Sequence, residues 1–246
     1  MRRSLGDNDR QASTRSREIE AVTLDATGTL FHCPRLAAIY AETLGRHGLA
    51  VDPDRVGELI PVVWRELDCR VGYGEDRFAS HSGGSRGFWK GFLQRLCALA
   101  GLSAPSRFLA AELYDRFARG ESWELYPEVE PVLARLAGRG LRLAVVSNWD
   151  ERLPGVLAEL GVAGRFASVV YSQRVGVEKP HPALFRRALD ELGVPPERAL
   201  HVGDRSRLDV EGATALGMRA LLLDRHRTGD GTGVIASLSE LQRVLA

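Results

Sequence analysis

The sequence predicts an α/β protein with a doubly wound parallel sheet and an inserted helical module. From residue 128 onward, short and nearly continuous apolar runs alternate with segments whose apolar residues fall at helical spacing. Apolar runs of this kind are typical of parallel strands that are covered on both faces. Between the first apolar run and this alternation, residues 35–124 read almost wholly helical. A chain of 246 residues is long enough for one such domain plus an insertion.

The first strand is expected at residues 20–25, and four helices are expected in the insertion that follows. A glycine- and serine-rich segment, residues 72–87, separates the second of these helices from the third and contains His81. It lacks Walker-type spacing, which favours a connector over a phosphate-cradling loop. Beyond the insertion we expect helices at residues 128–139, 151–160, 183–192, 210–216 and 238–245, and strands at residues 141–147, 166–171, 199–203 and 219–223.

Composition argues against several classes of partner. The formal net charge is +1, which gives no electrostatic reason to expect a nucleic acid or a membrane surface as partner. No apolar run approaches the length of a membrane-spanning helix. Residues 1–18 are rich in Arg and Ser, and we expect them to form a disordered leader without the apolar segment of a secretory signal. Cys33, Cys69 and Cys97 have no metal-like spacing, so reduced thiols in a cytoplasmic protein are expected.

Polar side chains follow the first two predicted strands at the point where each strand ends. Asp25 ends the first apolar run and is followed by small, turn-forming residues. Open α/β sheets bind their ligands at the carboxyl ends of the strands. Ser147 and Asn148 end the next strand and can hold a phosphoryl oxygen by hydrogen bonds. The alternative is that Ser147, Asn148 or Asp150 caps the following helix.

Two further motifs supply opposite charges. Lys179 is one of only two lysines, beside Lys90, among 33 basic residues, and it precedes a predicted helix where the helix dipole disfavours a cation. A solvated surface lysine is the alternative. Asp204 follows an apolar strand and Asp209 comes five residues later, so both carboxylates can converge with Asp25 on a hard cation. The alternative is that they cap and begin the next helix.

These four motifs, in this order, resemble those of the haloacid dehalogenase-like (HAD) hydrolase superfamily. The resemblance runs from about residue 20 to residue 223. It implies a sheet with strand order 3-2-1-4-5 and Asp25 at its centre. It also implies a core domain made of residues 19–34 and 125–246, with a helical cap at residues 35–124.

The resemblance implies that Asp25 is a nucleophile that attacks phosphorus and forms an aspartyl phosphate. Mg²⁺ is the implied cofactor, and a small phosphorylated metabolite is the implied substrate. Lys179 would clamp the charges, while Thr29, Ser147 and Asn148 would supply hydrogen bonds; Ser147, Asn148 and Lys179 would also bind the substrate. The implied metal site consists of Asp25, the Thr27 carbonyl, Asp204 and Asp209, the last of which would orient the metal shell.

One position departs from the family pattern. Most phosphatases of this superfamily carry a second Asp two residues after the nucleophile as general acid and base, and here that position is Thr27. Loss of such assistance typically lowers the rate by ~10² to 10⁴. P-type ATPases, whose motif reads Asp-Lys-Thr-Gly-Thr, share the Thr, which implies slow breakdown of the phosphorylated intermediate. The candidates for a replacement acid, by location alone, are Asp68, Glu75, Asp76 and His81, with His32 and Cys33 after the first motif.

Three other functions compete with a phosphatase. A dehalogenase would attack carbon with Asp25 and need no metal, which Asp204 and Asp209 disfavour. A phosphonatase would use a cap lysine as a Schiff base, and Lys90 is the only lysine in the cap segment. A binding protein that has lost catalysis would explain Thr27. The physiological substrate and the oligomeric state stay open.

Overall fold

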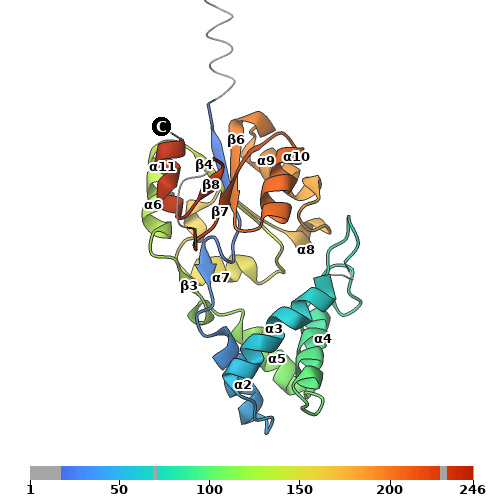
Figure 1. Ribbon diagram of the computed structural model, residues 1–246. Helices are drawn as coiled ribbons and strands as arrows, with labels where there is room; N and C mark the ends of the chain where they lie inside the picture. The colour runs from blue at the N-terminus through green and yellow to red at the C-terminus, as the bar shows by residue number, and fades with distance from the viewer. Residues whose placement is uncertain (1–17, 69–70, 228–231, 246) are drawn as a thin grey trace, which may run out of the picture.

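A six-stranded, all-parallel sheet forms the centre of the larger domain (Figure 1). The structure is a computed structural model that describes residues 18–68, 71–227 and 232–245. The leader expected at residues 1–18 therefore lies, apart from its last residue, outside the described residues, as does Cys69. The strands stand in the order β5 (Ser168–Tyr171), β4 (Arg142–Ser147), β1 (Ala21–Leu24), β6 (Ala199–Gly203), β7 (Arg219–Leu223) and β8 (Val234–Ile235).

The five predicted strands thus stand in the order 3-2-1-4-5, with β1 in the interior of the sheet. The sixth strand, β8, was not predicted. It has two residues and pairs with the outer edge of β7. A run this short carries no period-2 pattern from which a strand could be recognised.

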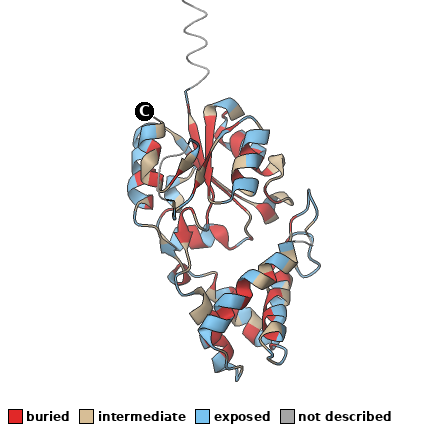
Figure 2. Cartoon of the chain, in the orientation of Figure 1, coloured by how far each residue is buried: buried red, intermediate tan, exposed pale blue. Residues whose placement is uncertain are grey.

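Helices cover both faces of the sheet, as expected for a doubly wound fold. Alternate side chains of a strand point to opposite faces. Val22 and Leu24 of β1 therefore join one core with α6 (Val129–Gly138) and α7 (Leu153–Glu159). Ala21 joins the other core with α9 (Pro182–Leu192) and α10 (Gly212–Ala215). Figure 2 shows the strands as the most continuously buried part of the chain.

The described part of the inserted segment folds into four helices, as predicted, with a hydrophobic core of their own. They are α2 (Leu36–Arg46), α3 (Pro53–Asp68), α4 (Gly84–Leu99) and α5 (Arg107–Arg116), and we refer to them with their loops, residues 35–124, as the cap. Figure 1 shows them below the sheet domain, at one end of the molecule. An antiparallel ribbon of β2 (Phe31–His32) and β3 (Glu124–Leu125) joins the chain where it leaves the core to the chain where it returns.

The local sequence explains how α9 begins and ends. Pro182 occupies the first turn, where a missing N–H is tolerated, and the His181 ring accepts a hydrogen bond from the Ala183 amide. Gly193 ends the helix with φ of 63°, a conformation that glycine adopts without strain. These features fix the position of the chain just after Lys179.

Two predicted helices are built differently from expectation. Residues 210–216 were expected as one helix, but a π-helical turn, η4 (Ser206–Glu211), precedes the short α10. Residues 238–245 divide into η5 (Leu238–Glu240) and α11 (Leu241–Val244). The remaining short helices are η1 (Gly120–Ser122), η2 (Ala163–Arg165), α8 (Ser172–Val175) and η3 (Pro196–Arg198). Within the described ranges, no helix combines the length and the apolar character needed to cross a bilayer.

Candidate active site

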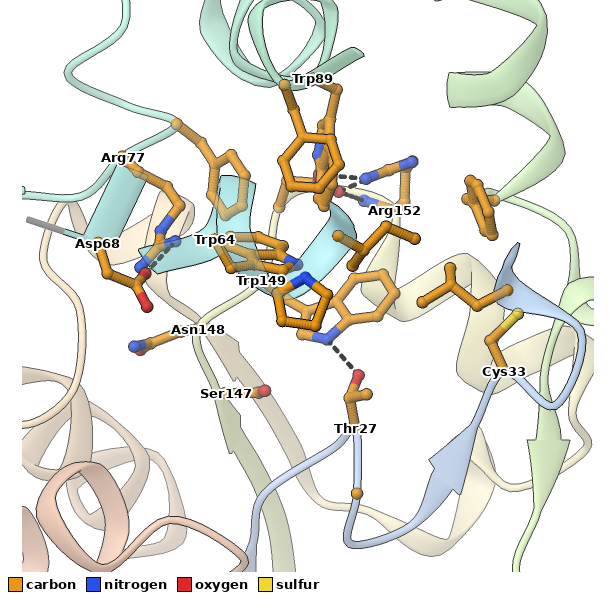
Figure 3. A pocket seen from close by; sticks show the side chains of 18 of the residues that line it. Thr27, Cys33, Trp64, Asp68, Arg77, Trp89, Ser147, Asn148, Trp149 and Arg152 are labelled. Carbon is orange, nitrogen blue, oxygen red and sulfur yellow. Dashed lines mark hydrogen bonds and ion pairs between the residues drawn. The ribbon is translucent and has the colours of Figure 1, made fainter. Parts of the chain in front are cut away.

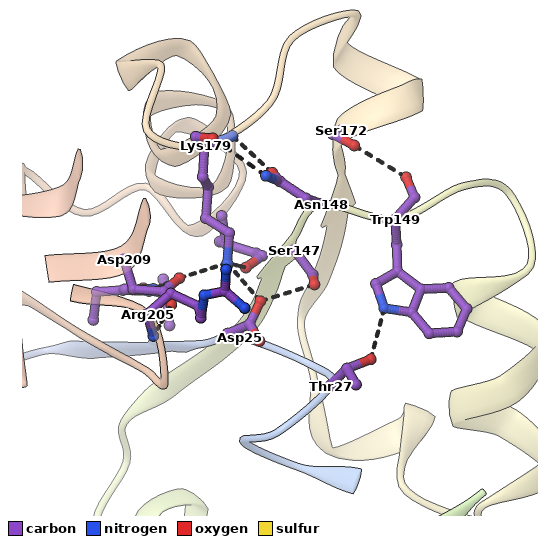
Figure 4. Close-up of polar contacts among 12 residues, drawn as sticks. Asp25, Thr27, Ser147, Asn148, Trp149, Ser172, Lys179, Arg205 and Asp209 are labelled. Atoms are coloured by element: carbon purple, nitrogen blue, oxygen red, sulfur yellow. Dashed lines mark hydrogen bonds and ion pairs between the residues drawn. The ribbon is translucent and has the colours of Figure 1, made fainter. Parts of the chain in front are cut away.

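Asp25 lies directly after β1, at the carboxyl end of the sheet, and is only 6% exposed. Its amide donates to the carbonyl of Val202 on the neighbouring strand β6, at 2.9 Å. Its Oδ1 accepts hydrogen bonds from Ser147 Oγ at 2.8 Å and from Lys179 Nζ at 2.5 Å (Figure 4). Its Oδ2 accepts none from the described residues, which leaves one carboxylate oxygen available for a ligand.

Lys179 is buried and fully engaged, so the interpretation as a solvated surface lysine is wrong. Its Nζ donates to Asp25 Oδ1 and Asp209 Oδ1, each at 2.5 Å, and to the Val146 carbonyl at 3.0 Å. An ammonium has three donors, and all three are used. The lysine therefore cross-links the ends of two strands to the turn after β6.

Asp209 lies at one end of a buried series of hydrogen-bonded side chains. Its Oδ1 also lies 3.1 Å from His201 Nε2, while His201 Nδ1 lies 2.8 Å from the Thr23 hydroxyl. Its Oδ2 accepts from the Arg205 amide at 2.9 Å, across the π-helical turn that points Asp209 inward. Both carboxylate oxygens are thus held by protein donors. This geometry favours a positioning role for Asp209 over direct metal ligation.

Sequence reasoning assigned no role to His201, although its position carried a signal. It is fully buried in β6, within the otherwise apolar run Ala-Leu-His-Val. A buried polar side chain needs a partner. Here the partners are Thr23 and Asp209.

The three carboxylates respond differently to this environment. Burial raises the pKa of Asp25, and the Lys179 ammonium opposes that shift. Burial also raises the pKa of Asp204, to about 6, and the charges of Asp25 and Asp209 add to the effect. For Asp209, burial also acts to raise the pKa, but Lys179 and His201 outweigh this effect and hold the pKa below the usual range. Burial lowers the pKa of Lys179, but Asp209 and Asp25 outweigh it and leave the lysine firmly protonated.

Ser147 and Asn148 both lie at the site, and neither caps the following helix. Asn148 Oδ1 accepts from the Lys179 amide at 2.7 Å, and its Nδ2 donates to the Lys179 carbonyl at 3.2 Å. Asn148 therefore positions the backbone of Lys179. Asp150 accepts instead from the Arg152 amide and from the indole of Trp89 in the cap.

The oxygen donors near Asp25 fit a hard cation. A Cβ on Gly28 would lie 2.4 Å from Asp204 Oδ2, so the Asp204 carboxylate packs against the turn after β1, where Gly28 has φ of +86°. Asp25, Asp204 and the Thr27 carbonyl are oxygen ligands of the kind that Mg²⁺ prefers. The described residues hold no group of three His, Cys, Asp or Glu side chains close enough to share a metal ion.

Thr29, expected to supply a hydrogen bond at the site, is not among the residues that line the cavity. Its side chain is fully buried, and its hydroxyl has no hydrogen-bond partner among the described residues. Its carbonyl and that of Gly28 are held by the Arg225 guanidinium at 2.8 and 3.0 Å. The turn that contains Thr29 is thus held in place by hydrogen bonds from Arg225.

A cavity of about 650 Å³ opens between Asp25 and the cap (Figure 3). Thr27 lies in its wall, and its Oγ1 accepts from the Trp149 indole at 3.0 Å. Of the candidate acids, Asp68 and Cys33 line the cavity, whereas Lys90, proposed for a Schiff base, is exposed and does not. The other candidates that do not line it are His32, Glu75, Asp76 and His81.

The cap and the core are joined beside Lys179 by an ion pair that the sequence did not reveal, which we call the Arg77–Glu178 bridge. Arg77 Nε and Nη2 donate to the two oxygens of Glu178 at 2.6 and 2.7 Å, and Nη1 donates to Asp68 at 2.9 Å. The side chains of Arg77 and Glu178 are 12% and 8% exposed. Residues 72–87 therefore form a structural contact as well as a connector.

A buried carboxylate at the carboxyl end of a parallel sheet, paired with a lysine and covered by helices, is the arrangement of a cap-bearing hydrolase. The chain belongs to the haloacid dehalogenase-like hydrolase family, whose model matches residues 19–217. This confirms the family expected from the four sequence motifs.

Individual relatives differ in the activity that they are named for. The chain is 33% identical over 210 residues to haloacid dehalogenase-like hydrolase domain-containing protein 3 of Mus musculus, covering 84% of this chain and 82% of that protein. It is 44% identical over 128 residues to a phosphoserine phosphatase of Thermus thermophilus, covering 50% and 49% of the two chains. Its structure resembles that of the L-2-haloacid dehalogenase RSc1362, with a TM-score of 0.70, 27% identity and coverage of 93% and 99%.

Proposed function

We propose that this hydrolase is a Mg²⁺-dependent phosphatase that acts on a small phosphorylated compound through a phosphorylated Asp25. The observation that carries the proposal is the pairing of Asp25 Oδ1 with Lys179 and Ser147, which leaves Oδ2 without a partner among the described residues. A carboxylate held in this way is oriented for attack on phosphorus. The phosphatase name of the Thermus thermophilus relative supports the same chemistry.

The other residues would orient and neutralise the reacting groups. Asp25, Asp204 and the Thr27 carbonyl would hold Mg²⁺, which when bound neutralises charge on the phosphoryl oxygens. Lys179 would stabilise charge near Asp25, and Ser147 would hold the attacking carboxylate. Asp209 and Asn148 would keep Lys179 in place through its ammonium and its backbone.

Thr27 limits which leaving groups can depart. A threonine hydroxyl does not give up a proton near neutral pH, so a leaving group that needs protonation would depart slowly. Acyl phosphates and nitrophenyl phosphate need little proton transfer. We therefore expect them to react faster than alkyl phosphates.

The decisive experiment measures phosphate release from acetyl phosphate and nitrophenyl phosphate with and without Mg²⁺. We expect release to require Mg²⁺ and to disappear in Asp25→Asn, because the amide oxygen is a poor nucleophile. Asp115→Asn, an exposed substitution on α5, is the matched control and should leave the rate unchanged. Acid quenching followed by mass spectrometry should find the phosphoryl group on Asp25. Full activity in Asp25→Asn would refute the proposal.

A dehalogenase is the second candidate, favoured by the likeness to the L-2-haloacid dehalogenase and by Thr27 in place of a proton donor. In that reaction Asp25 would displace halide from carbon and form an ester. Asp204 counts against it, because displacement of halide needs no metal ion and therefore gives no role to Asp204 as a metal ligand. Halide release from 2-chloropropionate in the presence of EDTA, with no phosphate release from any ester, would favour this candidate instead.

A further inference from the structure

The cavity continues from Asp25 into the interior of the cap, where its wall is apolar and aromatic. Every cap helix contributes to this wall, and the core adds Trp149. The rings of Trp64 and Phe92 pack with centroids 5.2 Å apart, and those of Tyr40 and Phe92 with centroids 6.3 Å apart. Figure 3 shows Trp64 and Trp89 facing the cavity from the cap, opposite Ser147 and Thr27 of the core. A preformed space of about 650 Å³ is far larger than a phosphate group needs.

The charged side chains at the cap end of the cavity already bind one another. Arg77 is paired with Glu178 and Asp68, as described above. Arg152 donates to Asp150 at 2.8 and 2.6 Å, and its guanidinium lies 5.1 Å from the centroid of the Trp89 ring. The guanidiniums are thus neutralised within the protein.

A second charge on a substrate would therefore meet an unfavourable environment in this part of the cavity. Beside Arg77 and Arg152, it would have to break one of these ion pairs or be buried without a partner, and either change is costly. Arg65 and Arg205 also line the cavity, but both are exposed and can remain in solvent. An uncharged ring or branched chain, by contrast, gains stability from burial.

We infer that the compound hydrolysed at Asp25 carries an apolar leaving group, aromatic or bulky acyl, with no second charged group, and that the cap encloses it. This inference rests on the proposed function, because that function places the phosphoryl group at Asp25. In the reaction of an acyl phosphate, an Asp25 oxygen forms a bond to phosphorus as the bond from phosphorus to the acyl oxygen breaks. The leaving group departs as a carboxylate and needs no proton. Water then releases inorganic phosphate and restores Asp25.

The first test compares phenylacetyl phosphate with acetyl phosphate, whose leaving groups share the same chemistry. We expect kcat/KM to be about 10- to 100-fold higher for phenylacetyl phosphate, which corresponds to burial of one aromatic ring. Trp64→Gln should reduce this ratio at least severalfold. Phe108→Gln, which replaces a 66% exposed aromatic of the same cap, should not change it. A ratio near one in the wild type would overturn the inference.

The second test separates the inference from the proposed catalysis by measuring binding alone. Calorimetry in Mg²⁺ compares methylphosphonate, benzylphosphonate and 4-carboxybenzylphosphonate, which have a carbon–phosphorus bond in place of the ester bond that a phosphatase cleaves. We expect benzylphosphonate to bind at least tenfold more tightly than either of the others. This order, in a protein that hydrolyses no phosphate, would support the apolar pocket and refute the phosphatase. Equal binding of the three, tighter binding of the carboxylated probe, or no binding of any would overturn the inference.

Discussion

At the scale of single residues, the site uses three carboxylates in different ways. Among the described residues, hydrogen-bond donors contact only one carboxylate oxygen of Asp25 but both oxygens of Asp209. Asp204 accepts no hydrogen bond from a described residue, and its carboxylate packs against Gly28. One buried lysine partly neutralises the three charges. The excess negative charge near Asp25 is what a divalent cation would balance.

Replacing Thr27 by aspartate tests whether the lack of a general acid at this position limits turnover. We expect Thr27→Asp to raise the turnover of alkyl phosphates by about 10- to 100-fold, because a carboxyl group can protonate their leaving oxygen. An aspartate can also keep the hydrogen bond from the Trp149 indole. Steady-state rates with alkyl and nitrophenyl phosphates measure the effect, and Thr27→Val is the control. An equal increase for both substrates would argue against a proton-transfer role for this position.

Asp209→Asn tests whether Lys179 depends on its buried partner. The substitution removes the charge that helps to keep the ammonium buried, so we expect a loss of about 1–3 kcal/mol in the free energy of unfolding. We also expect kcat to fall at least tenfold, with a smaller change in KM. Urea denaturation and steady-state kinetics measure the two effects. Unchanged stability would show that Asp25 alone suffices to hold the lysine.

At the scale of secondary-structure elements, the sequence predicts long elements well and short ones poorly. The five main strands are recognisable as apolar runs, and the four cap helices are long enough for a helical period to be visible. The strands β2, β3 and β8 have two residues each and were not predicted. The π-helical turn over Ser206–Glu211 was not predicted, since the helix was expected to begin only at residue 210. Asp209 within this turn is bound by Lys179, a contact between residues far apart in the sequence that no local pattern shows.

The Arg77–Glu178 bridge joins a cap loop to the segment that carries Lys179, and a double-mutant cycle can measure its strength. We expect Arg77→Met and Glu178→Gln to show a coupling free energy of about 1–3 kcal/mol, because both side chains are nearly buried. The exposed pair Arg55 and Glu58 on α3 serves as the control, with an expected coupling of about 0.3–0.5 kcal/mol. Urea denaturation of the single and double variants measures both values. Equal coupling in the two pairs would contradict a structural role for the bridge.

At the scale of the whole molecule, the candidate site lies between two separate cores, one in the cap and one beside the sheet. The sequence predicted the groups on the core side, because Asp25, Ser147, Lys179 and Asp204 follow strands or precede a helix in recognisable motifs. It did not predict the cavity wall. Trp64, Phe92 and Leu113 lie on helices that the sequence predicts, but only the packing of these helices shows that the three side chains face a cavity.

We expect the Asp204 carboxylate to favour metal binding but to lower the stability of the metal-free protein. Its raised pKa, caused by burial and by Asp25 and Asp209, means that its charge opposes folding at neutral pH when no cation is bound. We therefore expect Asp204→Asn to raise the melting temperature in EDTA. Mg²⁺ should stabilise the wild type, by about 2.7 kcal/mol at 100 times its Kd, and should not stabilise the variant. Thermal melts with and without Mg²⁺ measure both effects, and an equal Mg²⁺ response in the two proteins would contradict the assigned site.

The ribbon of β2 and β3 has a consequence for how such a protein can change over evolutionary time. Phe31 pairs with Leu125 and His32 with Glu124, so the two ends of the cap lie side by side, about 5 Å apart as in any strand pair. A helical module of different length or shape can therefore replace residues 35–122 without stretching the sheet that carries Asp25. The core can keep its chemistry while the inserted module is exchanged for another that encloses a different compound.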